Sequence, residues 1–175
     1  NYDFNINIQV VENKVRDNGS KYTVKSETPL ISAARWGNVK LVSDLLALGA
    51  DTSALCSTGD VLYSLLHSSV GTVEASEILE ILSLLDKNGF NINNWRVKYP
   101  KDSMRPAALI GMNALQFAIS WCKYPSVIMA ILDYNIPILE KHDGKTVLEL
   151  AKLNTDFYRT KEYWDLSDRY HSAKQ

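Results

Sequence analysis

A short pattern of residues recurs along this chain, and it restricts the possible fold more than any other feature. In its clearest copy, residues 28–34, a threonine and a proline precede leucine and alanine at helical spacing. Threonine caps a helix N-terminus through its side-chain oxygen, and proline suits the first helical position. Gly37 then interrupts the chain before a second apolar run that ends at Gly49. We therefore expect two short antiparallel helices joined by a tight turn.

Equivalent leucines show that this unit is repeated. Leu30, Leu62, Leu115 and Leu148 are separated by intervals of 32, 53 and 33 residues. Good helix caps precede these leucines by two positions: Thr28, Asp60, Asn113 and Thr146. Helix terminators follow at Gly49, Gly89 and Asn135. Two of the intervals match a period of about 33 residues, and the long one contains insertions near residues 68–76 and 95–110. Because such short helices are unstable alone in water, each unit is expected to stack on its neighbour.

The unit resembles the ankyrin repeat, and the resemblance extends from about Asp3 to Ala151. It implies an all-α fold, a solenoid of stacked helix-turn-helix units whose connecting loops, called fingers, include extended β-hairpins. We expect a single domain, residues 1–175. Its parts are the end of a preceding repeat plus a long hairpin finger (1–27), a repeat (28–59), a repeat with two insertions (60–110), a further repeat (111–142), and a terminal repeat with a capping helix (143–175). No copy has the family's histidine after the leucine, which predicts weaker hydrogen bonds between adjacent fingers.

Both ends of the chain have features of their own. Residues 16–20 contain an Asn-Gly turn between β-prone residues, which predicts a hairpin. The start echoes the end of an earlier repeat and is not a methionine, so we expect a fragment or a processed chain. Near the other end, one helical face carries Tyr163, Leu166, Tyr170 and Ala173. This pattern predicts a helix that caps the last repeat, binds a partner or leads to a further domain.

The composition argues against several classes of function. The net charge is −1, with 19 basic and 20 acidic residues, so no global charge attracts nucleic acid or an anionic membrane. No apolar run approaches the roughly 18 residues that span a bilayer. The three histidines are dispersed, and Cys56 and Cys122 are expected to be buried thiols, which suits a reducing cytoplasmic compartment. We expect no catalytic residue, no metal and no cofactor, and therefore no enzyme activity in this chain.

Stacked repeats bind other proteins through their fingers and through the exposed side of the first helix of each unit. The candidate contact residues are Arg35, Trp36 and Trp121 at helix ends, and Trp95, Arg96, Tyr99 and Arg105 in the long finger, residues 95–105. Aromatic residues and arginine dominate binding hot spots, although a tryptophan equally packs against a neighbouring repeat. The long finger has four basic residues and one acidic residue, a local charge of +3, which suits an acidic protein surface or a phosphate backbone.

The sequence predicts a non-catalytic module that binds a partner protein through its fingers and first-helix face. A second hypothesis is the substrate-recruiting domain of a larger enzyme, such as a pathogen effector acting in the host cytosol. A third hypothesis is nucleic-acid binding through the basic finger.

Overall fold

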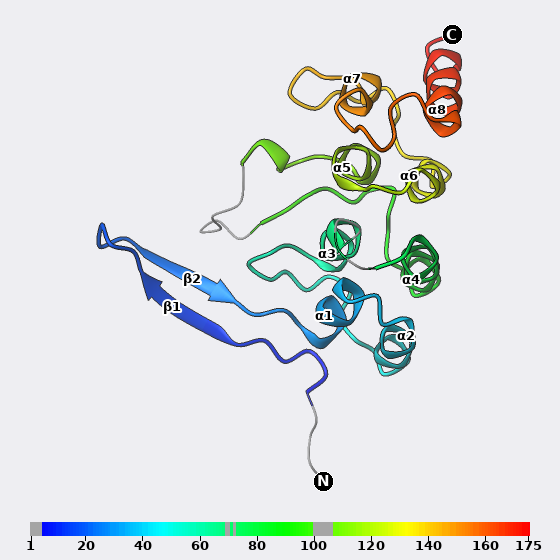
Figure 1. Cartoon of the computed structure of the whole chain (residues 1–175). Coiled ribbons are helices and arrows are strands. Elements are labelled where there is room, and N and C mark those ends of the chain that lie inside the picture. The colour runs from blue at the N-terminus through cyan, green and yellow to red at the C-terminus, as the bar shows by residue number, and fades with distance from the viewer. Residues whose placement is uncertain (1–4, 69–70, 72, 100–106) are drawn as a thin grey trace.

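Helix pairs stacked on one another make up most of the structure. The computed structural model describes residues 5–68, 71, 73–99 and 107–175. The helices of the described residues form these pairs: α1 (Pro29–Arg35) with α2 (Val39–Ala47), α3 (Val61–Ser68) with α4 (Ala75–Lys87), α5 (Ala114–Trp121) with α6 (Pro125–Leu132), and α7 (Val147–Ala151) with α8 (Lys161–Ser172). Figure 1 shows the pairs in successive layers, with the two chain ends at opposite ends of the stack.

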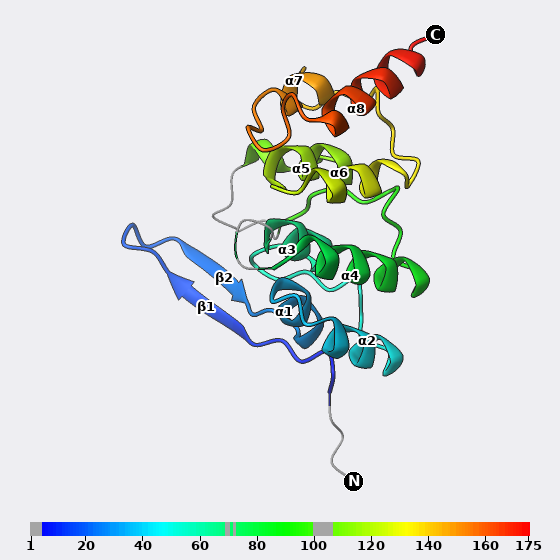
Figure 2. The same ribbon diagram turned by 45° about the vertical axis from the view of Figure 1, so that its right-hand side comes forward.

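The pairs form two columns of helices. The first helices, α1, α3, α5 and α7, pack in sequence on one another, and the second helices, α2, α4, α6 and α8, form the column beside them. The fingers, which connect one helix pair to the next, project from the first-helix column on the side away from the second helices (Figure 2). The core lies between neighbouring layers, where Leu30, Leu62 and Leu115 are at most 1% exposed. In the described residues, no helix is both long and apolar enough to span a membrane.

The four predicted helix caps are confirmed. Each cap side chain accepts a hydrogen bond from the backbone N–H three residues later: Thr28 from Ile31 (3.3 Å), Asp60 from Tyr63 (2.9 Å), Asn113 from Gln116 (2.9 Å) and Thr146 from Glu149 (3.3 Å). The predicted terminators are confirmed as well, since Gly49, Gly89 and Asn135 have φ angles of 81°, 82° and 59°. These local bonds explain why the pattern in the sequence sets the helix boundaries.

The predicted N-terminal hairpin is also confirmed. Strand β1 (Val11–Val15) pairs antiparallel with β2 (Lys21–Lys25) around the Asn18-Gly19 turn. The base of the hairpin is tied to the second finger, residues 50–59. There the Lys25 N–H donates to Ser57 Oγ at 2.8 Å, and the Ser57 N–H donates to the Lys25 carbonyl at 3.1 Å. Beyond this base the hairpin projects from the stack (Figure 1).

The two described arms of the long finger, which the sequence predicts to be an elongated hairpin, pair at an isolated antiparallel bridge between Arg96 and Asn113. In its described part, the Val97 N–H donates to the Met112 carbonyl at 2.9 Å, and the Gly111 N–H donates to the Val97 carbonyl at 3.0 Å. These bonds form no strand, and the segment ends in a short 3-10 helix, Ala107–Leu109. Val97 is buried because this end of the finger folds onto the stack. Residues 100–106 lie outside the described residues.

Helix α8 covers the last layer of the stack. Tyr163, Leu166 and Tyr170 are buried, and α8 packs on α6 and α7. Ala173 was expected on the same face, but it is exposed because the helix ends at Ser172. The apolar face of α8 is therefore already occupied by this chain, which favours the capping interpretation over a free partner-binding helix.

Asn154 holds this terminal segment against α5. Its side-chain amide donates to the carbonyls of Ile119 (2.8 Å) and Cys122 (2.9 Å). Its Oδ1 accepts from the N–H groups of Asp156 (3.0 Å) and Phe157 (3.2 Å).

We expect Asn154→Ala to lower the free energy of unfolding by about 1–2 kcal/mol, because partly buried backbone groups lose their partners. Equilibrium urea denaturation measures the change, and exposed Asn94→Ala serves as the control. Equal small losses in the two variants would contradict this role.

Candidate functional site

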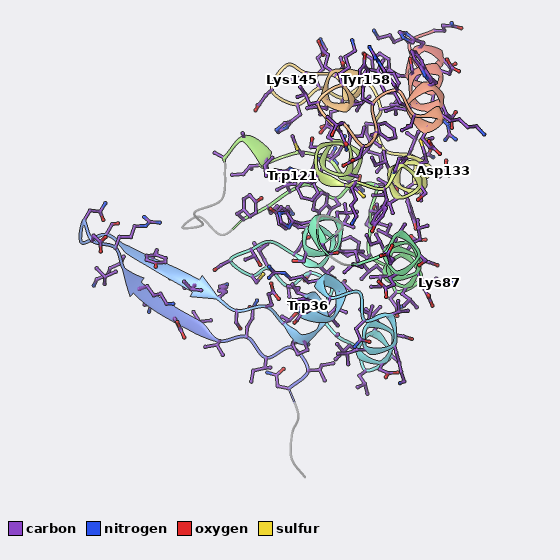
Figure 3. All side chains as sticks on the ribbon, viewed as in Figure 1. Trp36, Lys87, Trp121, Asp133, Lys145 and Tyr158 are labelled. Atoms are coloured by element: carbon purple, nitrogen blue, oxygen red, sulfur yellow. The ribbon has the colours of Figure 1, made fainter. Side chains whose placement is uncertain are left out.

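Two exposed tryptophans occupy equivalent helix ends. Trp36 follows α1 and Trp121 ends α5, each eight residues after its cap at Thr28 or Asn113. They are 72% and 40% exposed, respectively. Figure 3 shows both beside the first-helix column, with α3 in the layer between them. Since packed helices lie about 8–10 Å apart, the helices that carry these side chains, α1 and α5, are roughly 20 Å apart.

Aromatic rings from α3 and the long finger extend this surface. The His67 ring lies between Tyr63, at a centroid distance of 5.7 Å, and Trp121, at 5.6 Å. Tyr99 from the long finger meets the Tyr63 ring edge-on at 5.4 Å. Tyr63 and His67 are not among the contact residues predicted from the sequence. His67 nevertheless occupies the α3 position equivalent to Arg35, seven residues after the cap, so aligning the repeats would have found it.

Arg35 lies near this aromatic row. It forms an ion pair with Glu27, whose carboxylate also accepts a hydrogen bond from the Thr58 hydroxyl at 3.3 Å. Arg35 borders a small hollow together with Tyr63 and His67. Its side chain is 46% exposed, so the ion pair orients the guanidinium while leaving part of it accessible. Arg35 therefore remains accessible at the end of α1.

Trp95 does not fit its predicted role as a contact residue. The side chain is only 7% exposed and packs against Phe117, with 5.8 Å between ring centroids. Its indole N–H donates to Asp60 Oδ2 at 2.6 Å. Burial raises the pKa of the Asp60 carboxyl, and the hydrogen bonds donated by the Tyr63 N–H and the Trp95 indole oppose that rise only in part. Trp95 thus joins the long finger to the cap of α3 and is not part of an accessible surface.

Arg96 also connects parts of this chain. Its guanidinium pairs with Glu140 at 2.8 Å and donates to the Trp95 carbonyl at 2.9 Å. The Asn113 amide donates to the same Glu140 carboxylate at 3.2 Å, and the Gln116 amide donates to the Glu140 backbone carbonyl at 2.9 Å. The predicted weakening of contacts between adjacent fingers is therefore wrong here, because Gln116 supplies a bond at the position of the missing histidine.

The predicted residues thus divide into groups. Arg35, Trp36 and Trp121 lie on the exposed side of the first-helix column, and half-buried Tyr99 reaches the same aromatic row through Tyr63. Arg105 lies outside the described residues. Both cysteines are buried thiols, as expected. Within the part of the chain that the structure describes, no cluster of three His, Cys, Asp or Glu side chains is placed to hold a metal ion.

Comparison with known families identifies one part of the chain. Residues 26–57 match the family model of the ankyrin repeat. The matched segment contains α1, its preceding cap, α2 and most of the second finger. The chain matches no curated protein. Residues 26–57 therefore form an ankyrin repeat, a class of module that generally mediates protein binding and is typically non-catalytic.

Proposed function

We propose that this chain binds another protein through the tryptophan face, which we define as Arg35, Trp36, His67, Tyr99 and Trp121. The observation that carries the proposal is the pair of exposed tryptophans at equivalent ends of α1 and α5 (Figure 3). Large aromatic side chains that stay exposed on one side of a domain are typical of binding surfaces. Tryptophan and arginine are also the residues that most often dominate binding energy.

The positions of the residues in the tryptophan face indicate what kind of partner surface would fit it. The two tryptophans extend from helices that lie roughly 20 Å apart, so a partner must present two apolar contact points. The aromatic ring of His67 lies between them on the intervening helix. Arg35 adds a positive charge whose orientation is fixed by Glu27. A protein surface with two apolar contacts and an acidic group near the first of them satisfies all of these features.

We further propose that the other helix pairs are divergent ankyrin repeats, and that residues 1–175 form one solenoid domain. The recurring caps, the left-handed terminators and the stacking of first helices on first helices support this proposal. An intracellular location fits the two buried thiols, Cys56 and Cys122. The same architecture would serve as a recruiting domain within a larger protein.

Replacing the exposed tryptophans tests the proposed function. We expect Trp36→Ala and Trp121→Ala each to weaken the partner complex at least about tenfold, or about 1.4 kcal/mol, because each removes an aromatic anchor. The partner is isolated by cross-linking from position 36, and its affinity is measured by isothermal titration calorimetry.

The matched control is Trp164→Ala. Trp164 is 57% exposed on α8, away from the tryptophan face, so its replacement should leave the affinity unchanged. Denaturation midpoints verify that all three variants remain folded. Equal weakening by all three, or no weakening by Trp36→Ala and Trp121→Ala, would show that the partner binds elsewhere.

A further inference from the structure

The N-terminal hairpin presents an open edge along β1. The Arg16 N–H donates to the Ser20 carbonyl, and the Ser26 N–H donates to the Val10 carbonyl. Because hydrogen-bonded and non-hydrogen-bonded pairs alternate in an antiparallel ladder, even-numbered residues of β1 bond to β2 and the odd-numbered ones direct their backbone groups outward. The outward residues of β1 are Val11, Asn13 and Val15.

The two edges of the hairpin are not equivalent. On β2, Lys25 is an outward residue, and its N–H and carbonyl both bond to Ser57 of the second finger. For β1, the described residues supply no hydrogen-bond partner to the outward backbone groups of Val11, Asn13 and Val15. In both Figure 1 and Figure 2, β1 lies on the side of the hairpin away from the other loops. Val11 and Val15 are 56% and 63% exposed, so this edge is accessible.

The sequence of β1, Val-Glu-Asn-Lys-Val, is complementary to itself in the antiparallel direction. If two copies pair with their Asn13 residues opposite each other, Val11 of each copy faces Val15 of the other. Glu12 of each copy then faces Lys14 of the other copy. The outward backbone groups of the two strands meet in this register, which allows about six hydrogen bonds.

Both faces of such a pairing are favourable. The valines meet on one face, and on the other each carboxylate lies across from an ammonium group, an arrangement that stabilises antiparallel strands. Within one copy, Lys14 and Glu12 already lie 3.1 Å apart, so the four charges of two copies would alternate in sign. A parallel register would instead place like charges side by side.

Strand β2 lacks this complementarity. Self-pairing around Thr23 would place Lys21 across from Lys25, and like charges directly opposite each other are destabilising. Lysines on an exposed strand are a common protection against edge-to-edge association. The charge pattern therefore favours self-association through β1 and opposes it through β2.

We propose that two copies of this chain associate through antiparallel pairing of their β1 strands, which joins two hairpins into one four-stranded sheet. A two-stranded hairpin that projects into water is marginally stable alone, and the larger sheet stabilises it. Two strands of five residues form a small interface, so the dimer is reversible, with a dissociation constant of about micromolar or weaker. The pairing does not use the tryptophan face and is independent of the proposed binding of another protein.

Charge reversal tests the register of this dimer. The wild-type chain is compared with Glu12→Lys, with Lys14→Glu, with the double variant that carries both changes, and with an equimolar mixture of the two single variants. Sedimentation equilibrium over a range of concentrations gives each dissociation constant. Lys21→Glu on β2 is the matched control, because it makes the same change in net charge on the opposite face of the hairpin.

We expect a wild-type dimer that either single reversal weakens at least tenfold. The double variant should restore wild-type affinity, because lysine at position 12 again faces glutamate at position 14. The mixture should form a heterodimer for the same reason, and Lys21→Glu should leave the affinity nearly unchanged. A wild-type chain that stays monomeric up to millimolar concentration overturns the proposal. The β1 edge would then be a site for pairing with a strand of another protein. A dimer whose affinity is not restored in the double variant and the mixture overturns it as well.

Discussion

Replacing Phe117 with alanine is expected to lower the free energy of unfolding by about 3–5 kcal/mol. Phe117 is fully buried on α5, and its ring lies 4.7 Å from the Tyr63 ring of α3 and 5.8 Å from the Trp95 ring of the long finger. One side chain therefore joins two layers of the stack and the long finger. Domains of ordinary stability unfold at a cost of about 5–15 kcal/mol, so this loss is a large fraction of the total.

Equilibrium guanidinium denaturation, followed by far-ultraviolet circular dichroism, measures this effect. Because stacked repeats are stabilised by contacts between nearest neighbours, the loss at the α3–α5 contact is also expected to broaden the transition. Phe90→Ala is the matched control: Phe90 is only partly buried, three residues beyond the end of α4, and its loss should cost less. If Phe117→Ala costs no more than Phe90→Ala, the two layers are not joined through this ring.

The helix pairs could be predicted from the sequence because their boundaries depend on local bonds. Thr28 and Asn113 each bond to a backbone N–H three residues away, and Gly49 and Gly89 each allow a left-handed turn. The N-terminal hairpin was predictable for the same reason, since the Asn-Gly turn acts on its immediate neighbours. The burial of Val97 against the stack was not predictable in this way, because it depends on residues that are distant in the sequence.

The roles of individual site residues depended on partners that are distant in sequence. Trp95 is buried because its indole reaches Asp60, 35 residues earlier, and Arg96 pairs with Glu140, 44 residues later. Because tryptophan and arginine are both common on binding surfaces, their residue types alone predict that Trp95 and Arg96 contact a partner. Trp36 and Trp121, in contrast, follow their caps at the same distance, and their exposure agrees with the position that the repeat pattern assigns to them.

Trp95→Phe is expected to lower the free energy of unfolding by about 2–3 kcal/mol at neutral pH, because the buried Asp60 carboxylate loses a hydrogen-bond donor. The loss should depend on pH. Burial already raises the pKa of Asp60 in the folded chain above its ordinary value of 3.8, so the contribution of this carboxyl to stability falls as the pH rises from 3.8 through the folded-state pKa. Removing the indole N–H raises the folded-state pKa further.

The difference between Trp95→Phe and the wild-type chain should therefore be smallest in acid, where Asp60 is protonated in both folded proteins. It should grow as the pH rises above the pKa of Asp60 in the folded wild-type chain, and become constant above the higher pKa of the variant. Guanidinium denaturation between about pH 4 and pH 8 measures this dependence. The control is the same replacement in an Asp60→Asn background. Asparagine does not titrate, so the pH-dependent part should vanish while the packing loss remains. A difference that is constant with pH in the Asp60 background would mean that the indole N–H does not stabilise the charged carboxylate.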